Sequence, residues 1–503
     1  MKPRKIMGLL LGLLSTAHLA AGQRPAAVIP PAVAPAPVDE LVITNVNVVN
    51  VDLGEIEPNT NVVLRDGFIV SVGKWLPAGR GVPAVDGRGK YLVPGLWDGR
   101  THALTTAAVE QVALPLYVAH GITSIRDVGT GRPLTDLLRT YQALETGVRP
   151  GPRIELAGPV LDGSADHHTG LGLTATRTEG RQQAEAQIRA GWCSLQPGPW
   201  LSHEAYWGVA AAAQEARVHL VGPVPEAVPV LAAVAAGQRG IEQTDKLLLG
   251  CSGRETEFVQ ARALALAGRR PLATLQARTK AQQPDIVASF SAERCTALAQ
   301  ALVQYQVFVL PQLGARDFDL RRDPDPEDPR YRSVPASVRQ QWALAAHERP
   351  RLAPARLARL QTADSLQRRL VAALGQAGVR LVAGSDAGSG TPHIFYGGSL
   401  HDELERLVGL GLTPAAALRA ATINAAMAAG RGFDLGRLHS GYLADMVLLN
   451  GNPLDDIHNL RLIQAVVLRG HLFDLPALAR LAADAEKAAA QQDAASRAVT
   501  AIR

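Results

Sequence analysis

Cysteine is scarce in this chain, with three residues among 503. The three are Cys193, Cys251 and Cys295, an odd number without the paired spacing of a zinc ribbon. The pattern indicates neither a disulfide framework nor a cysteine-bound metal. We expect at least one of the three to be a buried thiol.

Charged residues are also few, at 19% of the chain against 47% hydrophobic residues. A chain of this length and composition can bury a large core and form two or three domains. The net charge of +5 comes from arginines spread along the whole sequence, without a basic cluster or interleaved aromatic residues. Because nucleic acid needs such a cluster, we expect no nucleic-acid partner.

Several catalytic motifs are absent as well. The sequence contains no G-x-S-x-G nucleophile elbow and no P-loop, and no G-x-G-x-x-G run follows an expected strand. These absences argue against a serine hydrolase of the α/β type and against a nucleotide-binding domain. Any chemistry must therefore come from other residues.

The N-terminus has the pattern of a signal peptide. Basic residues precede a short apolar run, 6–14, and small residues offer a cleavage site before Gln23. The run is too short to span a bilayer as a mature anchor, so we expect no transmembrane segment in the mature form. A buried N-terminal helix is the alternative. We expect an exported protein, periplasmic or secreted.

The rest of the chain changes character three times. Short strands with turns give way to alternating apolar strands and Ala- and Leu-rich helical stretches over more than 300 residues, and strands then return. Repeated β-α units of this extent predict a parallel (β/α)8 barrel of the TIM type, with a β-sandwich assembled from both ends of the chain. The expected divisions are a signal peptide at 1–22, a Pro/Ala-rich linker at 23–40, sandwich parts at 41–92 and 436–474, the barrel at 93–435 and a helical tail at 475–503.

The run YLVPGLWDGRTHAL, at 91–104, resembles the end of the first barrel strand in the amidohydrolase superfamily, in its imidazolonepropionase-like and prolidase-like branch. That family has the pattern PG-x-x-D-x-H-x-H. Further runs fit in the expected order, among them GITSIRDVGT, GPRIELAGPVL, GSDAGSGTPHIFYGGSLHDELERLV and GYLADMVLLNGNPLDDI. The resemblance covers 41 to about 473 and implies a barrel that holds one or two divalent metals at its C-terminal mouth.

The resemblance also assigns a residue to each metal-ligand position, and most of these residues are poor ligands. His102 and Asp386 are retained, and Asp386 also stands at the family's base position. The other four positions carry Arg100, Gln196, Pro223 and Gln243. The chain has no lysine between 90 and 246, so no shift of alignment restores a carboxylated lysine. Arginine and proline side chains offer no lone pair, and a catalytic zinc needs about three protein ligands.

Histidines elsewhere offer other contacts. His167 and His168 fall in a loop that resembles a family loop over the mouth, and His393 and His401 follow Asp386. We interpret these four as loop packing or ligand-side hydrogen bonding, with metal binding as the alternative. His401 and Glu403 are expected to order the loop after the eighth strand. The charged insertion between 312 and 352 is either a solvated loop or a lid.

These residues predict a disabled enzyme. The inherited reaction is metal-assisted hydrolysis of a carbon–nitrogen bond, and the expected function is binding of a small ligand or a partner protein, with Arg100, His168, Gln196, Gln243 and His393 as binding residues. No cofactor is expected. An active dipeptidase or amidohydrolase, with Asp386 as base and a divalent zinc, is the alternative. A hydrolase that works without a metal is a second alternative.

The arginine at a metal-ligand position has its own prediction. The first and last strands of such a barrel are neighbours, so Arg100 and Asp386 are expected to face each other across the mouth. A buried aspartate without a metal needs a counter-charge, and an arginine fork can bind both of its oxygens. The alternative is that Arg100 extends to solvent.

Overall fold

The computed structural model describes residues 40–74, 82–163, 175–268, 271–318, 320, 325–348 and 352–502, without the side chains of 495–502. The expected signal peptide, nearly all of the linker, and the loop with His167 and His168 lie outside these ranges. None of the described helices is long and apolar enough to cross a membrane.

Eight parallel strands form the central sheet, and their order in the sheet is their order in the sequence. Such strands are buried on both faces, and β7 is buried at every one of its six positions. The strands are β6 (Leu96–Thr101), β7 (Ile122–Asp127), β8 (Arg153–Leu161), β9 (Ser194–Pro197), β10 (His219–Gly222), β11 (Gly240–Glu242), β12 (Phe308–Leu310) and β13 (Arg380–Leu381).

Backbone hydrogen bonds between β6 and the segment after β13 close this sheet into a barrel. The Gly99 N–H donates to the Ala383 carbonyl over 2.9 Å, and the Asp386 N–H donates to the Arg100 carbonyl over 2.9 Å. Gly99 has a physical reason to be glycine, because a Cβ there would lie 2.6 Å from Cγ1 of Val382. The expected contact between the first and last strands is therefore confirmed.

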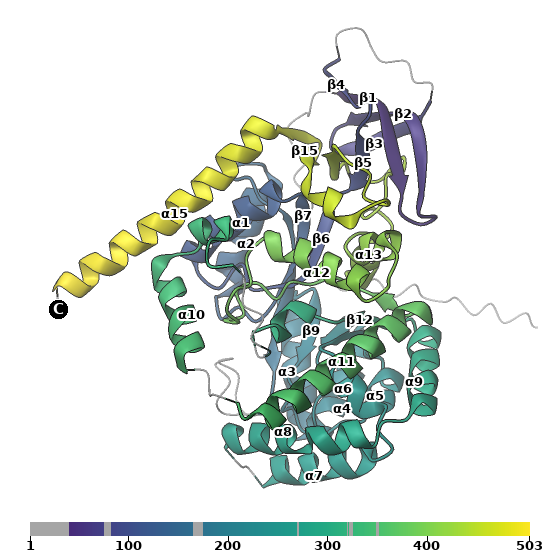
Figure 1. The fold of residues 1–503 in the computed structure, drawn as a ribbon, viewed down its shortest axis with the longest axis vertical. Helices are drawn as coiled ribbons and strands as arrows, with labels where there is room; N and C mark the ends of the chain where they lie inside the picture. Colours follow the sequence, from purple (N-terminus) through teal and green to yellow (C-terminus); the bar gives the residue numbers. More distant parts are fainter. Residues whose placement is uncertain are drawn as a thin grey trace, which may run out of the picture.

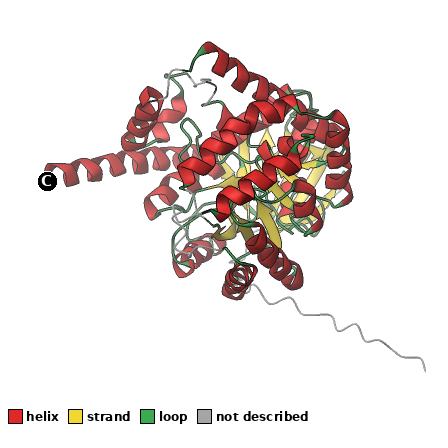
Figure 2. Ribbon diagram, turned by 90° about the horizontal axis from the view of Figure 1, so that it is seen from below, coloured by secondary structure: helices red, strands yellow, loops and turns green. Residues whose placement is uncertain are grey.

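Helices surround the strands, as Figure 2 shows from below. Thr106 and Thr176 cap the helices after them, the second with a full capping box to Glu179. The helices are α1 (Ala107–Ala119), α2 (Leu134–Glu145), α3 (Arg177–Ala190), α4 (His203–Ala216), α5 (Val230–Ala235), α6 (Asp245–Gly250), α7 (Glu255–Ala267), α8 (Leu272–Ala288), α9 (Ala292–Gln304), α10 (Ala336–Glu348), α11 (Pro354–Gln376), α12 (Gly398–Gly409), α13 (Pro414–Ala420) and α14 (Ile423–Ala428), with 3-10 turns η1 (Leu313–Arg316) and η2 (Pro329–Ser333).

A second, mostly antiparallel sheet lies beside the barrel and joins both ends of the chain (Figure 1). Its central contact is between β5 and β14, which run antiparallel, and it has an apolar core of its own. Its strands are β1 (Leu41–Asn50), β2 (Glu55–Arg65), β3 (Phe68–Gly73), β4 (Ala84–Asp86), β5 (Tyr91–Pro94), β14 (Met446–Leu449), β15 (Ile463–Leu468) and β16 (His471–Asp474), with η3 (Ile457–Arg461) between β14 and β15. The predicted fold class is confirmed.

The chain ends in one long helix, α15 (Leu475–Ile502). In Figure 1 it crosses α1 and projects beyond the body of the protein. Cys251 and Cys295 form a disulfide that ties the C-terminus of α6 to α9, and Cys193 is free. The interpretation of the cysteines is corrected here: a free thiol is present as expected, but a pairing across 44 residues could not be deduced from the count.

Candidate functional site in the barrel mouth

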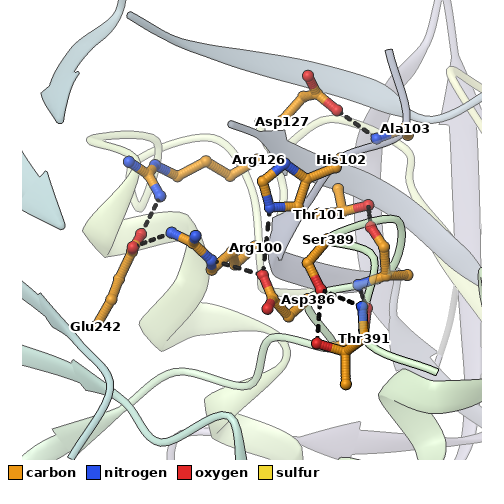
Figure 3. A network of polar contacts seen from close by, with 12 residues as sticks. Arg100, Thr101, His102, Ala103, Arg126, Asp127, Glu242, Asp386, Ser389 and Thr391 are labelled. Carbon is orange, nitrogen blue, oxygen red and sulfur yellow. Dashed lines mark hydrogen bonds and ion pairs between the residues drawn. The ribbon is translucent and has the colours of Figure 1, made fainter. Parts of the chain in front are cut away.

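Arg100 and Asp386 form an ion pair at the C-terminal end of the barrel (Figure 3). Nε of Arg100 donates to Oδ1 of Asp386 over 2.7 Å, and both side chains are nearly nine-tenths buried. The closing hydrogen bond between the two backbones brings the residues together. The predicted pair is confirmed. The alternative, that the Arg100 side chain extends to solvent, is wrong because that side chain is buried.

The arginine fork is divided, which corrects the expectation that it would bind both oxygens of Asp386. Nη1 of Arg100 instead donates to Oε2 of Glu242, the last residue of β11. Oε1 of Glu242 accepts from Nη1 of Arg126 over 2.6 Å. Glu242 is completely buried between the two guanidinium groups. Four charges of alternating sign therefore cross the barrel interior (Figure 3).

This network continues to the third strand. Nε of Arg126 lies 3.8 Å from Oε1 of Glu155 on β8, and burial raises the pKa of Glu155. The residues of this network lie on four strands, β6, β7, β8 and β11. Their side chains point into the barrel because side chains alternate between the two faces of a strand. The sequence analysis did not identify Arg126, Glu155 and Glu242 as site residues. The signal that could have identified them is a charged residue inside an otherwise apolar strand.

The electrostatics keep Asp386 ionised. Burial alone would raise the pKa of this carboxyl, but Arg100 and His102 lower it to about 2. Burial also opposes the charge on Arg100, yet Glu242 and Asp386 raise its pKa. Nε2 of His102 lies 3.4 Å from Oδ1 of Asp386. The two retained family positions thus remain adjacent, with a guanidinium beside them.

The other expected site residues lie in different surroundings. Gln196 is buried at the end of β9, and its Oε1 has no partner among the described residues. Gln243 is exposed and has a left-handed backbone with φ of 63°, so the inward residue at this strand end is Glu242. Nδ1 of His393 is 2.8 Å from the Tyr331 hydroxyl. His168 lies outside the described residues.

The two residues expected to order the loop after the eighth strand have other contacts. Glu403 accepts the backbone N–H groups of Leu313 and Gly314 over 2.8 Å and 3.0 Å, so it orders the turn after β12, the seventh strand. Nε2 of His401 is 2.9 Å from the His120 carbonyl, at the end of α1. The expectation that these two residues order the loop after the eighth strand is therefore wrong. Their side chains, on α12, bind the turn after the seventh strand and the end of α1.

Two further buried carboxyls hold the backbone of the mouth. Oδ1 of Asp98 accepts the Ser385 N–H over 2.9 Å, and its Oδ2 accepts the Ser385 hydroxyl over 2.5 Å. Oδ2 of Asp127 accepts the N–H groups of Ala103 and Leu104 over 2.6 Å and 3.0 Å. Burial raises the pKa of Asp98 to about 7 and that of Asp127 to about 8, although these hydrogen bonds act in the opposite direction.

These raised pKa values predict a pH-dependent stability. Each carboxyl binds its proton more tightly in the folded state, so its contribution is full below about pH 4 and is lost as the pH rises through about 7 to 8. We expect the Tm to fall over this window and Asp127→Asn to flatten the fall, because the amide is neutral. Thermal melts across the window, with the exposed Asp484→Asn as control, measure it. An unchanged slope in Asp127→Asn would contradict the assignment.

The donor set does not fit a family metal centre. Of the six positions that the resemblance assigns to metal ligands, only His102 and Asp386 carry a residue that binds metals readily, and Asp386 is bonded to Arg100. Among the described residues, no three His, Cys, Asp or Glu side chains are grouped to hold a metal ion. A guanidinium beside the remaining ligands also repels a dication. We therefore derive no chemical step through a metal.

A closed parallel barrel with polar residues at the C-terminal ends of its strands defines the class of TIM-barrel proteins whose sites lie at that end. Within that class, residues 349–473 match the model of the amidohydrolase family. This part of the sequence therefore resembles the amidohydrolase family, as the motifs predicted, and the barrel fold agrees with it.

Sequence similarity to curated proteins is local. Over 85 residues the chain is 35% identical to an adenine deaminase of Oceanobacillus iheyensis, a match to 17% of this chain and 14% of that protein. Over 83 residues it is 40% identical to the ochratoxinase of Aspergillus niger, a match to 16% of each. The chain thus spans about a seventh of the length of these relatives.

Structural similarity extends over most of the chain. The structure of bottromycin amidohydrolase matches with a TM-score of 0.66 and 24% identity, covering 89% of this chain and 90% of that one. The A. niger ochratoxinase structure matches with a TM-score of 0.60 and 19% identity, covering 88% and 97%. At these identities the matches establish the fold.

Proposed function

We propose that this chain is an exported amidohydrolase-fold protein that has lost metal-dependent hydrolysis and uses its barrel mouth to bind a small ligand or a partner protein. One observation carries the proposal: the Arg100 guanidinium lies between the Asp386 and Glu242 carboxylates. The resemblance assigns the position of Arg100 to a metal ligand. A charge fixed to the chain replaces that of the metal, but a guanidinium has no open coordination position to activate water.

The state of Asp386 supports the same conclusion. A general base works best with a pKa near the working pH, and the pKa of Asp386 is about 2. Its Oδ1 is also engaged by Arg100. Asp386 is therefore the inherited base position without the basicity the role needs. Arg100, Gln196, Gln243, His393 and His168 are proposed as binding residues of the mouth.

Metal content separates this proposal from its alternative. We expect protein purified without chelators to carry well under one zinc, manganese or iron per chain by elemental analysis, because too few ligands remain. Added zinc should barely change the Tm, since a tight ligand of the folded state would raise it. Asp86→Asn, an exposed carboxylate outside the barrel, serves as the matched control for weak surface binding.

One observation favours the alternative, an active metal-dependent amidohydrolase or dipeptidase: His102 and Asp386 remain 3.4 Å apart. In that case one ion per chain would bind, and His102→Gln and Asp386→Asn would each abolish its binding. Such a result would overturn the proposed loss of the metal.

We also propose that the protein is exported. The disulfide between Cys251 and Cys295 supports this, because such bonds persist in oxidising compartments. Mass spectrometry of periplasmic or secreted material should find a mature protein that begins near Gln23. Material that retains Met1 and remains in the cytoplasm would contradict it.

A further inference from the structure

Three segments that are far apart in the sequence meet beside the barrel mouth. They are α15, the insertion that contains η2 and α10, and the loop 387–397 that follows Asp386. The first of them is anchored on α1, where Ala485, Ala488 and Ala489 pack against Val112 and Leu116. Figure 1 shows α15 lying across α1 with α10 close by.

The tail helix caps the insertion. Oδ1 of Asp493, on α15, accepts the backbone N–H of Ala336 over 2.7 Å. Ala336 is the first residue of α10, and its N–H has no partner within the helix. Asp493 provides that partner although it lies 157 residues away in the sequence. A carboxylate at this end also interacts favourably with the helix dipole.

The insertion in turn holds the loop after Asp386. The Tyr331 hydroxyl is 2.8 Å from Nδ1 of His393, and the Arg330 guanidinium lies 4.4 Å from the centre of the Phe395 ring. The Trp342 ring, on α10, lies 5.7 Å from that of Phe395 and 5.4 Å from that of His393, in edge-on contacts. Edge-to-face contacts of this kind are specific in geometry and favour one loop position.

The loop finally touches the site itself. The Tyr396 hydroxyl donates to the His102 carbonyl over 3.4 Å, and the His102 N–H donates to the Ala387 carbonyl over 2.8 Å. Tyr396 also packs against the cluster between α1 and α15. A continuous set of contacts therefore runs from the tail helix to the residues beside Asp386.

We propose that α15 is a strap: it holds the insertion against loop 387–397 and so fixes the rim of the barrel mouth. Release of α15 from α10, by a competing partner or by proteolysis of the projecting end, loosens that rim. This device requires neither a metal nor turnover, so it stands or falls independently of the proposed function.

Hydrogen exchange by mass spectrometry tests the strap without an activity assay. In Asp493→Ala we expect backbone amides at the start of α10 to exchange about fivefold faster, the factor expected for a lost cap, and amides of loop 387–397 to accelerate as well. Asp493→Asn retains an accepting oxygen and should exchange almost like the wild type. Asp484→Ala, exposed on the same helix, is the matched control.

A second variant acts at the other end of the insertion. Tyr331→Phe removes only the hydroxyl that meets His393, and we expect faster exchange in loop 387–397 while α15 is unchanged. Acceleration confined to α10 in Asp493→Ala, or a loop that exchanges at the wild-type rate in both variants, would overturn the proposal.

Discussion

Replacing Arg100 by alanine should lower the free energy of unfolding by about 3 to 5 kcal/mol, the range for breaking a buried ion pair by removing one partner. The substitution leaves Asp386 without its arginine and leaves Glu242 with Arg126 alone. Because both carboxylates are buried, water cannot replace the lost guanidinium at low cost. Urea denaturation followed by circular dichroism measures the change.

A double-mutant cycle shows whether the two residues interact directly. Adding Asp386→Ala to Arg100→Ala should recover part of the lost stability, since the stranded carboxylate disappears. Arg100→Lys is the matched control: it keeps the charge but has no fork to reach both carboxylates, so an intermediate loss is expected. Additive effects of the two alanine substitutions would contradict the pairing.

Removing the disulfide should cost about 2 to 4 kcal/mol, the usual range for a native cross-link. Cys251 and Cys295 are 44 residues apart, so the bond restricts a long loop of the unfolded chain. We expect the double variant Cys251→Ser/Cys295→Ser to melt at a lower temperature than the wild type, and reductant to lower the Tm of the wild type only.

The free thiol provides the control for that experiment. Burial raises the pKa of Cys193 to about 11, so the thiol is unreactive, and Cys193→Ser should leave the effect of reductant unchanged. Thiol titration of the denatured, unreduced protein should find one thiol per chain. Three thiols, together with no effect of reductant, would show that the bond is absent.

The sequence predicted the pair at the site because that pair depends on topology alone. Arg100 and Asp386 stand at the ends of the first and last strands, and any closed eight-stranded barrel places those strands side by side. The resemblance to the family's motifs supplied the positions of the two residues, and the order of the strands supplied their contact.

Glu242 could not be assigned in the same way. The motif Ile241-Glu242-Gln243 drew attention to Gln243, the residue that the resemblance assigns to a metal-ligand position. The backbone of Gln243 is left-handed, so its side chain is exposed, while Glu242 points inward to Arg100 and Arg126. Which of the two side chains points inward depends on the residue at which the strand ends. The strand period alone does not predict that residue.

The sequence by itself determined the barrel and the β unit from both chain ends, because these depend on periodicity and on the order of the elements. Only the tertiary structure decided how the guanidinium of Arg100 is shared, which cysteines are bonded and where α15 rests. Each of these depends on distances between surfaces that are remote in sequence. Such distances are set by packing of the whole chain, and no local pattern records them.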